Sequence, residues 1–85
     1  MCATKQLLLY TRAGCELCDQ AASMFGSLDC AAQWQLHKVD IDSDAALNTQ
    51  YGLRIPVVKR EDSGAELYWP FPPSRLRAFL QASAG

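Results

Sequence analysis

The sequence lacks a long apolar run, an excess of charge of either sign and any low-complexity tract. Its 85 residues carry eight Lys and Arg against nine Asp and Glu, which gives a formal net charge of −1. This balance excludes the basic surface that binds nucleic acid or an anionic membrane. No apolar run approaches the roughly 20 residues of a membrane-spanning helix. We therefore expect a globular protein with neither nucleic acid nor membrane among its partners.

The N-terminal residues also lack the pattern of an export signal. They show no basic region followed by an apolar stretch and a small-residue cleavage site. We therefore expect a cytoplasmic protein, and in that compartment stable disulfides are rare and paired cysteines serve catalysis or metal binding. A chain of this length builds one compact core, so we expect a single domain over residues 1–85.

The chain has four cysteines, fewer than a disulfide-rich secreted scaffold usually carries, and two of them lie in an informative place. The segment Cys15-Glu16-Leu17-Cys18 follows the apolar run of residues 7–10 and precedes a helical pattern. Two thiols at this spacing can form and break a disulfide within one helical turn. The free N–H groups and the dipole of a helix that starts at Cys15 would stabilise a thiolate there. The spacing therefore indicates thiol–disulfide chemistry.

A zinc site is the alternative interpretation of this pair, and it requires two further ligands. Besides acidic residues, the candidates are Cys2, Cys30 and His37, and the sequence holds no second Cys-x-x-Cys and no His-x-x-x-His. We therefore expect no metal. We interpret Cys30 as a buried apolar residue, Cys2 as an exposed incidental thiol and His37 as a surface residue.

Hydrophobic periodicity predicts the element order βαβαββα. We expect strands over 5–11, 34–41, 56–60 and 65–69, and helices over 15–28, over 44–51 and after Pro72 or Pro73. Asp42 or Ser43 is expected to cap the second helix and Gly52 to end it. A helix joins the first two strands, which predicts a parallel pair with a right-handed crossover, and the last two strands should form an antiparallel hairpin.

With three motifs placed in this order of helices and strands, the chain resembles the glutaredoxin-like branch of the thioredoxin-fold superfamily, and the small bacterial glutaredoxin-like proteins in particular. The motifs are the segments 10–18, 39–42 and 51–57. The resemblance spans nearly the whole chain and implies an α/β thioredoxin-like fold, with a four-stranded mixed sheet flanked by helices. It also implies that Cys15 is the exposed nucleophile, that Cys18 is the more buried resolving thiol, and that Pro56 is cis and lies beside the disulfide.

The sequence departs from typical glutaredoxins at two places. Glu16-Leu17 replaces the usual Pro-Tyr between the cysteines, and the segment 68–73 replaces a Gly-Gly turn that helps glutaredoxins bind glutathione. Glutathione and a thioredoxin reductase are therefore the two candidate electron donors. Within that segment, Trp69 and Phe71 could form an apolar rim at the site, but we expect them to pack against the last helix.

Further residues are candidates for binding substrate. Arg12 lies where glutaredoxins often carry a lysine. Its side chain either stabilises the Cys15 thiolate or contacts substrate, or it is simply solvated, and the sequence favours neither alternative. Glu16 opposes Arg12, so we expect a moderately lowered pKa for Cys15 and a reducing couple. A cis bond before Pro56 would turn the backbone of Ile55 towards Cys15 and offer its N–H and C=O to a substrate. Arg54 would bind a substrate carboxylate or form a surface ion pair.

These observations predict a thiol–disulfide oxidoreductase that reduces disulfides of proteins or small molecules. Cys15 would attack the disulfide, and Cys18 would resolve the mixed disulfide that results. No bound cofactor is required, because glutathione or a thioredoxin reductase would supply the electrons. The alternative is a non-enzymatic redox-sensing or adaptor module on the same fold. Nothing in the sequence demands a second subunit, so we expect a monomer.

Overall fold

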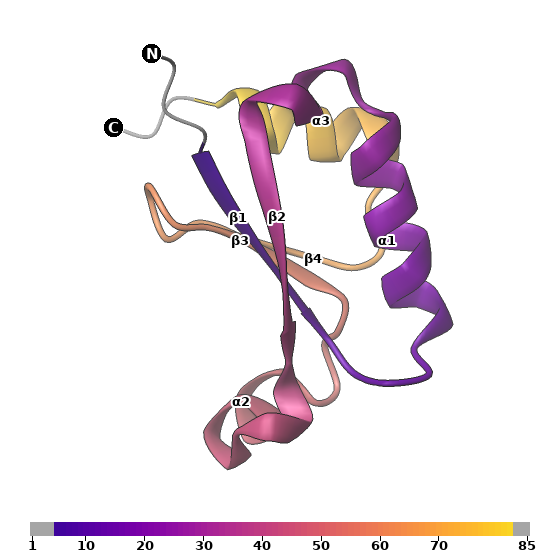
Figure 1. Cartoon of the computed structure of the whole chain (residues 1–85), viewed down its shortest axis with the longest axis vertical. Helices are drawn as coiled ribbons and strands as arrows, with labels where there is room; N and C mark the ends of the chain where they lie inside the picture. The colour runs from indigo at the N-terminus through magenta and orange to yellow at the C-terminus, as the bar shows by residue number, and fades with distance from the viewer. Residues whose placement is uncertain (1–4, 83–85) are drawn as a thin grey trace.

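The computed structural model describes residues 5–82, so Cys2 lies outside the described part of the chain. The elements follow the predicted order: β1 (Lys5–Thr11), α1 (Glu16–Ser27), β2 (Trp34–Asp40), α2 (Ala45–Tyr51), β3 (Val57–Arg60), β4 (Glu66–Tyr68) and α3 (Pro73–Gln81). Two short 3-10 helices, Asp29–Gln33 and Ile41–Ser43, stand before and after β2. The mixed four-stranded sheet with flanking helices confirms the predicted fold class (Figure 1).

The sheet has the strand order β2-β1-β3-β4. β1 pairs with β2 in parallel, as expected, while β1–β3 and β3–β4 are antiparallel. Four segments that are far apart in the sequence therefore meet at one end of the sheet: the ends of β1, β2 and β4 and the start of β3. We call this end the disulfide edge, because Cys15 follows β1 there.

Apolar side chains pack against β1 from both faces of the sheet. The side chains of β1 alternate, with Leu7 and Leu9 towards α1 and α3, and Leu8 and Tyr10 towards α2. Figure 1 shows α1 and α3 on one side of the strands and α2 at the lower end. Tyr10 stacks on Tyr51 of α2, with the ring centroids 4.3 Å apart. A continuous apolar run is typical of a strand that is covered in this way.

The segment after β4 packs as the sequence predicts. Phe71 is 3% exposed and belongs to the same core as Leu76 and Leu80 of α3. Trp69 contacts Phe71 edge to face, with the ring centroids 5.1 Å apart. Cys30 is buried in the same core, which confirms its interpretation as an apolar residue.

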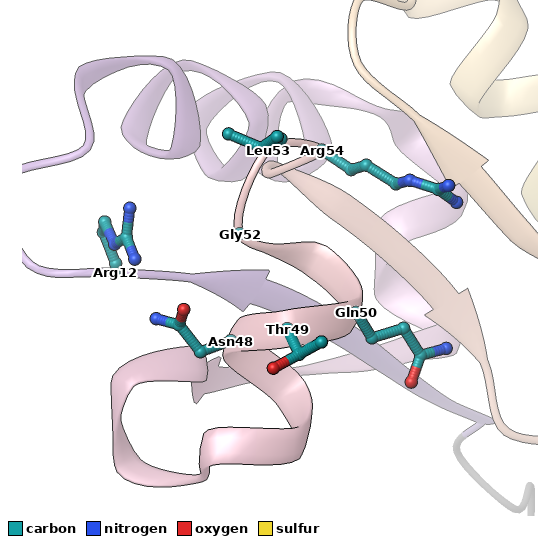
Figure 2. Close-up of a pocket in the computed structure, with 7 residues that line it drawn as sticks. All are labelled: Arg12, Asn48, Thr49, Gln50, Gly52, Leu53 and Arg54. Atoms are coloured by element: carbon teal, nitrogen blue, oxygen red, sulfur yellow. The ribbon is translucent and has the colours of Figure 1, made fainter.

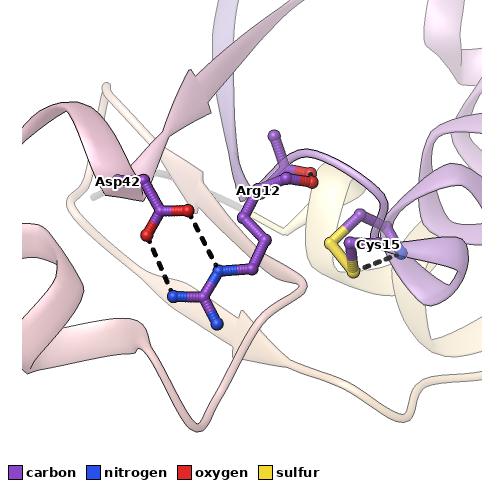
Figure 3. Close-up of a disulfide and its surroundings, with 5 residues drawn as sticks. Arg12, Cys15 and Asp42 are labelled. Carbon is purple, nitrogen blue, oxygen red and sulfur yellow. Dashed lines mark hydrogen bonds and ion pairs between the residues drawn. A yellow bond between two sulfur atoms is a disulfide. The ribbon is translucent and has the colours of Figure 1, made fainter.

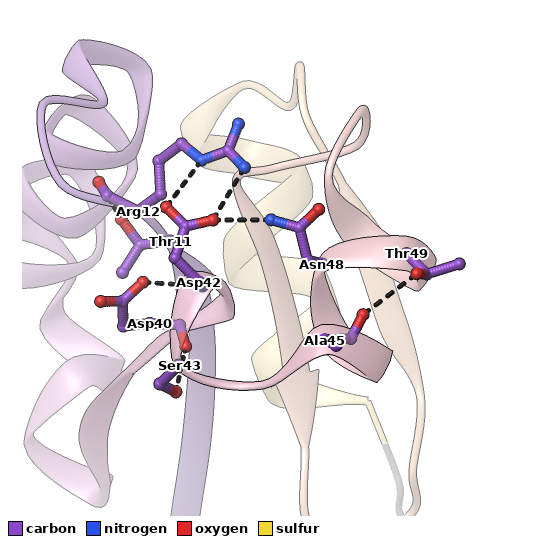
Figure 4. Close-up of polar contacts among 8 residues, drawn as sticks. All are labelled: Thr11, Arg12, Asp40, Asp42, Ser43, Ala45, Asn48 and Thr49. Atoms are coloured by element: carbon purple, nitrogen blue, oxygen red, sulfur yellow. Dashed lines mark hydrogen bonds and ion pairs between the residues drawn. The ribbon is translucent and has the colours of Figure 1, made fainter.

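The start of α2 differs from the prediction. Residues 41–43 form a 3-10 helix, for which the Asp40 side chain accepts the N–H of Asp42. The helix α2 then begins at Ala45, and its cap is Asp44, which accepts the N–H of Ala46 at 2.9 Å. The prediction that Asp42 or Ser43 caps this helix was therefore wrong. The Asp42 side chain is used elsewhere, as Figure 4 shows.

The one buried charged side chain among the described residues is Arg60 of β3, which is 1% exposed. Its guanidinium forms a fork on the Asp62 carboxylate, at 3.0 and 2.7 Å. It also donates to the carbonyls of Phe79 and Ala82, at 2.7 and 2.8 Å, and stacks over Trp34 at 4.9 Å. Arg60 thus caps the C-terminal end of α3 and ties it to the β3–β4 hairpin.

Replacement of Arg60 should destabilise the protein strongly. Arg60→Met leaves Asp62 and two carbonyls without their donor, so the free energy of unfolding should fall by about 3–5 kcal/mol. Arg77→Met is the matched control, because the Arg77–Asp29 pair is exposed and should contribute at most about 1 kcal/mol. Urea unfolding measures both variants, and equal midpoints would contradict the assigned role.

The same pair makes stability depend on pH at the acidic end. The hydrogen bond from Arg60 holds the pKa of Asp62 below its ordinary value. The contribution is therefore complete above the unfolded-state pKa of about 3.9 and is lost as the pH falls through the lowered, folded-state value. In Arg60→Met this part of the acid dependence should disappear.

Candidate functional site

The turn between β1 and α1 places Cys15 immediately before the first residue of the helix. Gly14 has φ = 75°, a backbone conformation that residues with a Cβ atom rarely adopt. The N–H of Cys15 then closes the turn on the carbonyl of Arg12, at 3.3 Å. Cys15 is the N-cap of α1, and its Sγ accepts the N–H of Cys18 at 3.2 Å. The helix N-terminus therefore faces this sulfur, which stabilises negative charge on it.

Cys15 and Cys18 are joined by a disulfide whose Cα atoms are 5.2 Å apart (Figure 3). The two cysteines differ in accessibility: Cys18 is 2% exposed and belongs to the core, whereas Cys15 is partly exposed. A molecule in solution can therefore reach the Cys15 sulfur far more easily than the Cys18 sulfur. This asymmetry matches the roles that the resemblance implies for the two residues.

A hollow of about 280 Å³ opens at the disulfide. We call it the disulfide hollow. Arg12 and both cysteines line it, together with three charged residues that the sequence analysis did not select: Asp19, Lys38 and Asp40. The signal for Lys38 lay in strand alternation, since Trp34, Leu36 and Lys38 share the face of β2 that α1 covers. The parallel register places Lys38 beside Leu9, next to the first turn of α1.

Arg12 forms an ion pair with Asp42 across the disulfide edge. Its Nε and Nη2 donate to the two carboxylate oxygens of Asp42, at 3.3 and 3.0 Å, and Asn48 donates to the same carboxylate at 2.6 Å. Figure 3 shows the Arg12 side chain extending away from the disulfide, and Figure 4 shows the contacts of Asp42. The hydrogen bond from Arg12 lowers the pKa of Asp42, and the same bond raises the pKa of Arg12.

The loop before β3 contains the Ile55–Pro56 bond, which is cis. The carbonyl of Pro56 accepts the N–H of Trp69 at 3.2 Å, so this loop is joined to the end of β4. The N–H of Ile55 donates to the carbonyl of Tyr51 at 3.1 Å. The expectation that this N–H is offered to a substrate therefore does not hold. A substrate strand at this loop would have to use the Ile55 carbonyl.

A second hollow, of about 350 Å³, lies between α2, its following loop and Arg12. We call it the Arg54 hollow, and Figure 2 shows the residues that line it: Arg12, Asn48, Thr49, Gln50, Gly52, Leu53 and Arg54. Arg54 makes it suitable for a carboxylate, whereas the guanidinium of Arg12 is already paired with Asp42. The Arg54 guanidinium stands over the Tyr68 ring, 5.6 Å from its centroid. Arg12 lines both hollows and so connects them.

A polar network that runs from buried Tyr51 to exposed Tyr68 supports this side of the sheet. The Tyr51 and Tyr68 hydroxyls both donate to the Glu66 carboxylate. Burial, followed by the bond to Glu66, raises the pKa of Tyr51. Burial raises the pKa of Glu66 as well, but the two tyrosine hydroxyls and nearby cations outweigh it, so that the pKa is lowered overall. Glu66 is therefore an ionised anchor that fixes the position of Tyr68 below Arg54.

His37 contacts the Gln6 side chain on the exposed part of β1 and β2, which confirms that it is a surface residue. Within residues 5–82, no helix is long and apolar enough to cross a membrane. The same residues contain no group of three or more His, Cys, Asp or Glu side chains that could hold a metal ion.

Comparison with known proteins gives a consistent family. A family model described as "Glutaredoxin-like domain (DUF836)" matches residues 6–81. The uncharacterized protein Rv0508 of Mycobacterium tuberculosis is 32% identical, over 92% of this chain and 84% of its own length. The X-ray structure of protein XcR50 from X. campestris is 47% identical, covers 91% of this chain and 97% of that one, and has a TM-score of 0.79.

The solution structure of protein Ne2328 from Nitrosomonas europaea is 24% identical, over 95% of this chain and 96% of that chain, with a TM-score of 0.78. At this identity the likeness concerns the fold. The fold therefore persists among sequences that have diverged widely.

The Arg12–Asp42 pair leads to a prediction about the Cys15 thiol in the reduced protein. Asp42→Asn removes the charge that neutralises Arg12, so the pKa of Cys15 should fall; Arg12→Gln should raise it. Ultraviolet thiolate absorbance as a function of pH measures both effects, and added salt should weaken them. Asp29→Asn removes an equal charge beyond the far end of α1 and should change nothing. Shifts of the same sign in the first two variants would contradict the prediction.

Proposed function

The chain belongs to the glutaredoxin-like domain family, and from this premise we propose that it is a thiol–disulfide oxidoreductase that reduces disulfides. One observation carries the proposal: the two sulfurs at the N-terminus of α1 differ in accessibility. An accessible sulfur next to free helical N–H groups is suited to attack, and a buried partner within the same turn is suited to resolve.

The proposed reaction transfers two electrons from the cysteine pair to the substrate. The Cys15 thiolate attacks one sulfur of a substrate disulfide, forms a mixed disulfide and releases the other sulfur as a thiolate that takes up a proton. The thiol of Cys18 then loses its proton and attacks Sγ of Cys15. This second step forms the Cys15–Cys18 disulfide and releases the second substrate thiol. The protein ends oxidised and the substrate reduced.

An external thiol must then reduce the Cys15–Cys18 disulfide. Two glutathione molecules could do this and leave as glutathione disulfide, and a thioredoxin reductase is the other candidate. The Arg54 hollow supports a donor that carries a carboxylate, because the Arg54 guanidinium lines it. We place this cycle in the cytoplasm, whose thiol pool keeps such a pair reduced. The proposal requires no metal and no bound organic cofactor, and a monomer is sufficient for it.

The first test is the reduction potential of the Cys15–Cys18 pair in glutathione buffers. We expect a value between about −200 and −270 mV, the range of glutaredoxins and thioredoxin. The protein should also reduce many molecules of a disulfide for each molecule of protein. A pair that is oxidised once without turnover would overturn the enzymatic proposal and leave the redox-sensing adaptor, whose affinity for a partner changes with its oxidation state.

Two cysteine variants separate the roles of the two sulfurs. With glutathione disulfide, Cys18→Ser should accumulate a mixed disulfide at Cys15, because the resolving thiol is missing. Cys15→Ser should form none, and Cys30→Ala should behave like the wild type, since this buried cysteine takes no part in the reaction. Mass spectrometry of the intact protein reads out all three. A mixed disulfide on Cys18 instead would reverse the assignment.

A further inference from the structure

Exposed apolar side chains are concentrated at the disulfide edge. Among residues 5–82, three large hydrophobic side chains are exposed: Leu17 at 44%, Leu53 at 103% and Tyr68 at 42%. Leu17 lies between the two cysteines, Leu53 lies in the loop before Pro56, and Tyr68 ends β4 opposite Val57. Apolar surface that gathers around one site marks a place where another molecule binds.

Backbone hydrogen bonds tie the loop that presents Leu53 to the end of α2. The N–H of Gly52 donates to the carbonyl of Asn48 at 2.8 Å, and the N–H of Arg54 donates to that of Tyr51 at 2.8 Å. A Cβ atom on Gly52 would stand 2.5 Å from the Asn48 carbonyl oxygen, so glycine is required for this close approach. Leu53 is thus fully exposed on a fixed backbone, and a partner that covers it orders little more than one side chain.

The surroundings of Leu53 are continuous with the redox site. Leu53 and Arg12 line the Arg54 hollow, and Arg12 and Cys15 line the disulfide hollow. A ligand that is bound to the Cys15 sulfur and extends past Arg12 would enter the hollow that Leu53 lines. Glutathione could place a carboxylate on Arg54, but it has no apolar side chain for Leu53. A polypeptide has both.

We propose that the substrate is a protein disulfide, and that Leu53 binds an apolar side chain of the substrate near its cysteine while Arg54 attracts a neighbouring carboxylate. This proposal rests on the proposed function and names its substrate class. The two-electron exchange at Cys15 and Cys18 is unchanged. Leu53 acts in this scheme as a specificity-determining residue that takes no part in the chemistry.

The test compares three disulfides as substrates: the oxidised dimer of Ac-Glu-Cys-Leu-amide, the oxidised dimer of Ac-Gln-Cys-Ser-amide, and glutathione disulfide. The reduced protein should reduce the Glu-Cys-Leu dimer with a higher kcat/KM than the other two. Leu53→Ser should lower kcat/KM for this dimer about tenfold. The free energy that corresponds to this factor is smaller than the free energy gained by burying a leucine side chain completely. The same variant should change kcat/KM for glutathione disulfide by a much smaller factor, because glutathione has no apolar side chain to contact Leu53.

Two control variants accompany Leu53→Ser. Leu53→Met keeps an apolar side chain and should retain the wild-type preference. Ala78→Ser adds a hydroxyl on α3, beside a separate hollow between α3 and β4, and should change no rate. Leu53 and Ala78 are both exposed, so all three variants should unfold close to the wild-type urea concentration.

The outcomes separate the two proposals. If the three disulfides are reduced but Leu53→Ser changes all rates equally or none of them, the substrate proposal is overturned and the oxidoreductase stands. If no disulfide is reduced, the proposed function fails. Peptide binding at Leu53 is then tested by measuring the affinity of the oxidised protein for the reduced Ac-Glu-Cys-Leu-amide peptide. Equal affinities of the wild type and Leu53→Ser would overturn the proposed role of Leu53 as well.

Discussion

The parallel pairing of β1 with β2 is the constraint on which the disulfide edge depends. In this register Thr11 stands opposite Asp40, so the turns that follow the two strands leave the sheet side by side. Arg12 and Asp42, 30 positions apart in sequence, then form their ion pair. The antiparallel strand β3 begins at the same edge, which brings Pro56 to it. Slippage of the register by one residue would separate these groups and also reverse the faces of β2.

The same edge shows how a small domain can combine a rigid frame with a reactive group. Its loops are fixed by short local contacts: the positive φ of Gly14, the close approach of Gly52 to Asn48, and the carboxylate of Asp44 at the start of α2. The electrostatics, in contrast, are balanced. Arg12 is held by Asp42, and the disulfide hollow carries charges of both signs. The geometry is thus set by the backbone, while the reactivity depends on exposed charges that solvent and salt can modulate.

The sequence was sufficient for the element order, for the fold class and for the cysteine pair, because these depend on local periodicity and on spacing along the chain. It was insufficient where a role depends on tertiary contacts. Arg60 has the charge of a surface residue, yet it is buried because Asp62, two α3 carbonyls and Trp34 converge on it. Asp42 was expected to cap a helix, but it lies beside Arg12 once β1 and β2 pair. Lys38 joins the disulfide hollow for the same reason.

The hydrogen bonds of Arg60 also bear on which parts of the protein can open independently. Two of its acceptors are the carbonyls of Phe79 and Ala82, at the C-terminal end of α3. If α3 detached from the sheet, Nη1 of this buried guanidinium would lose both acceptors, and Leu76 and Leu80 would leave the core. Local opening of α3 is therefore costly, and we expect its amide hydrogens to exchange with solvent only when the whole domain unfolds.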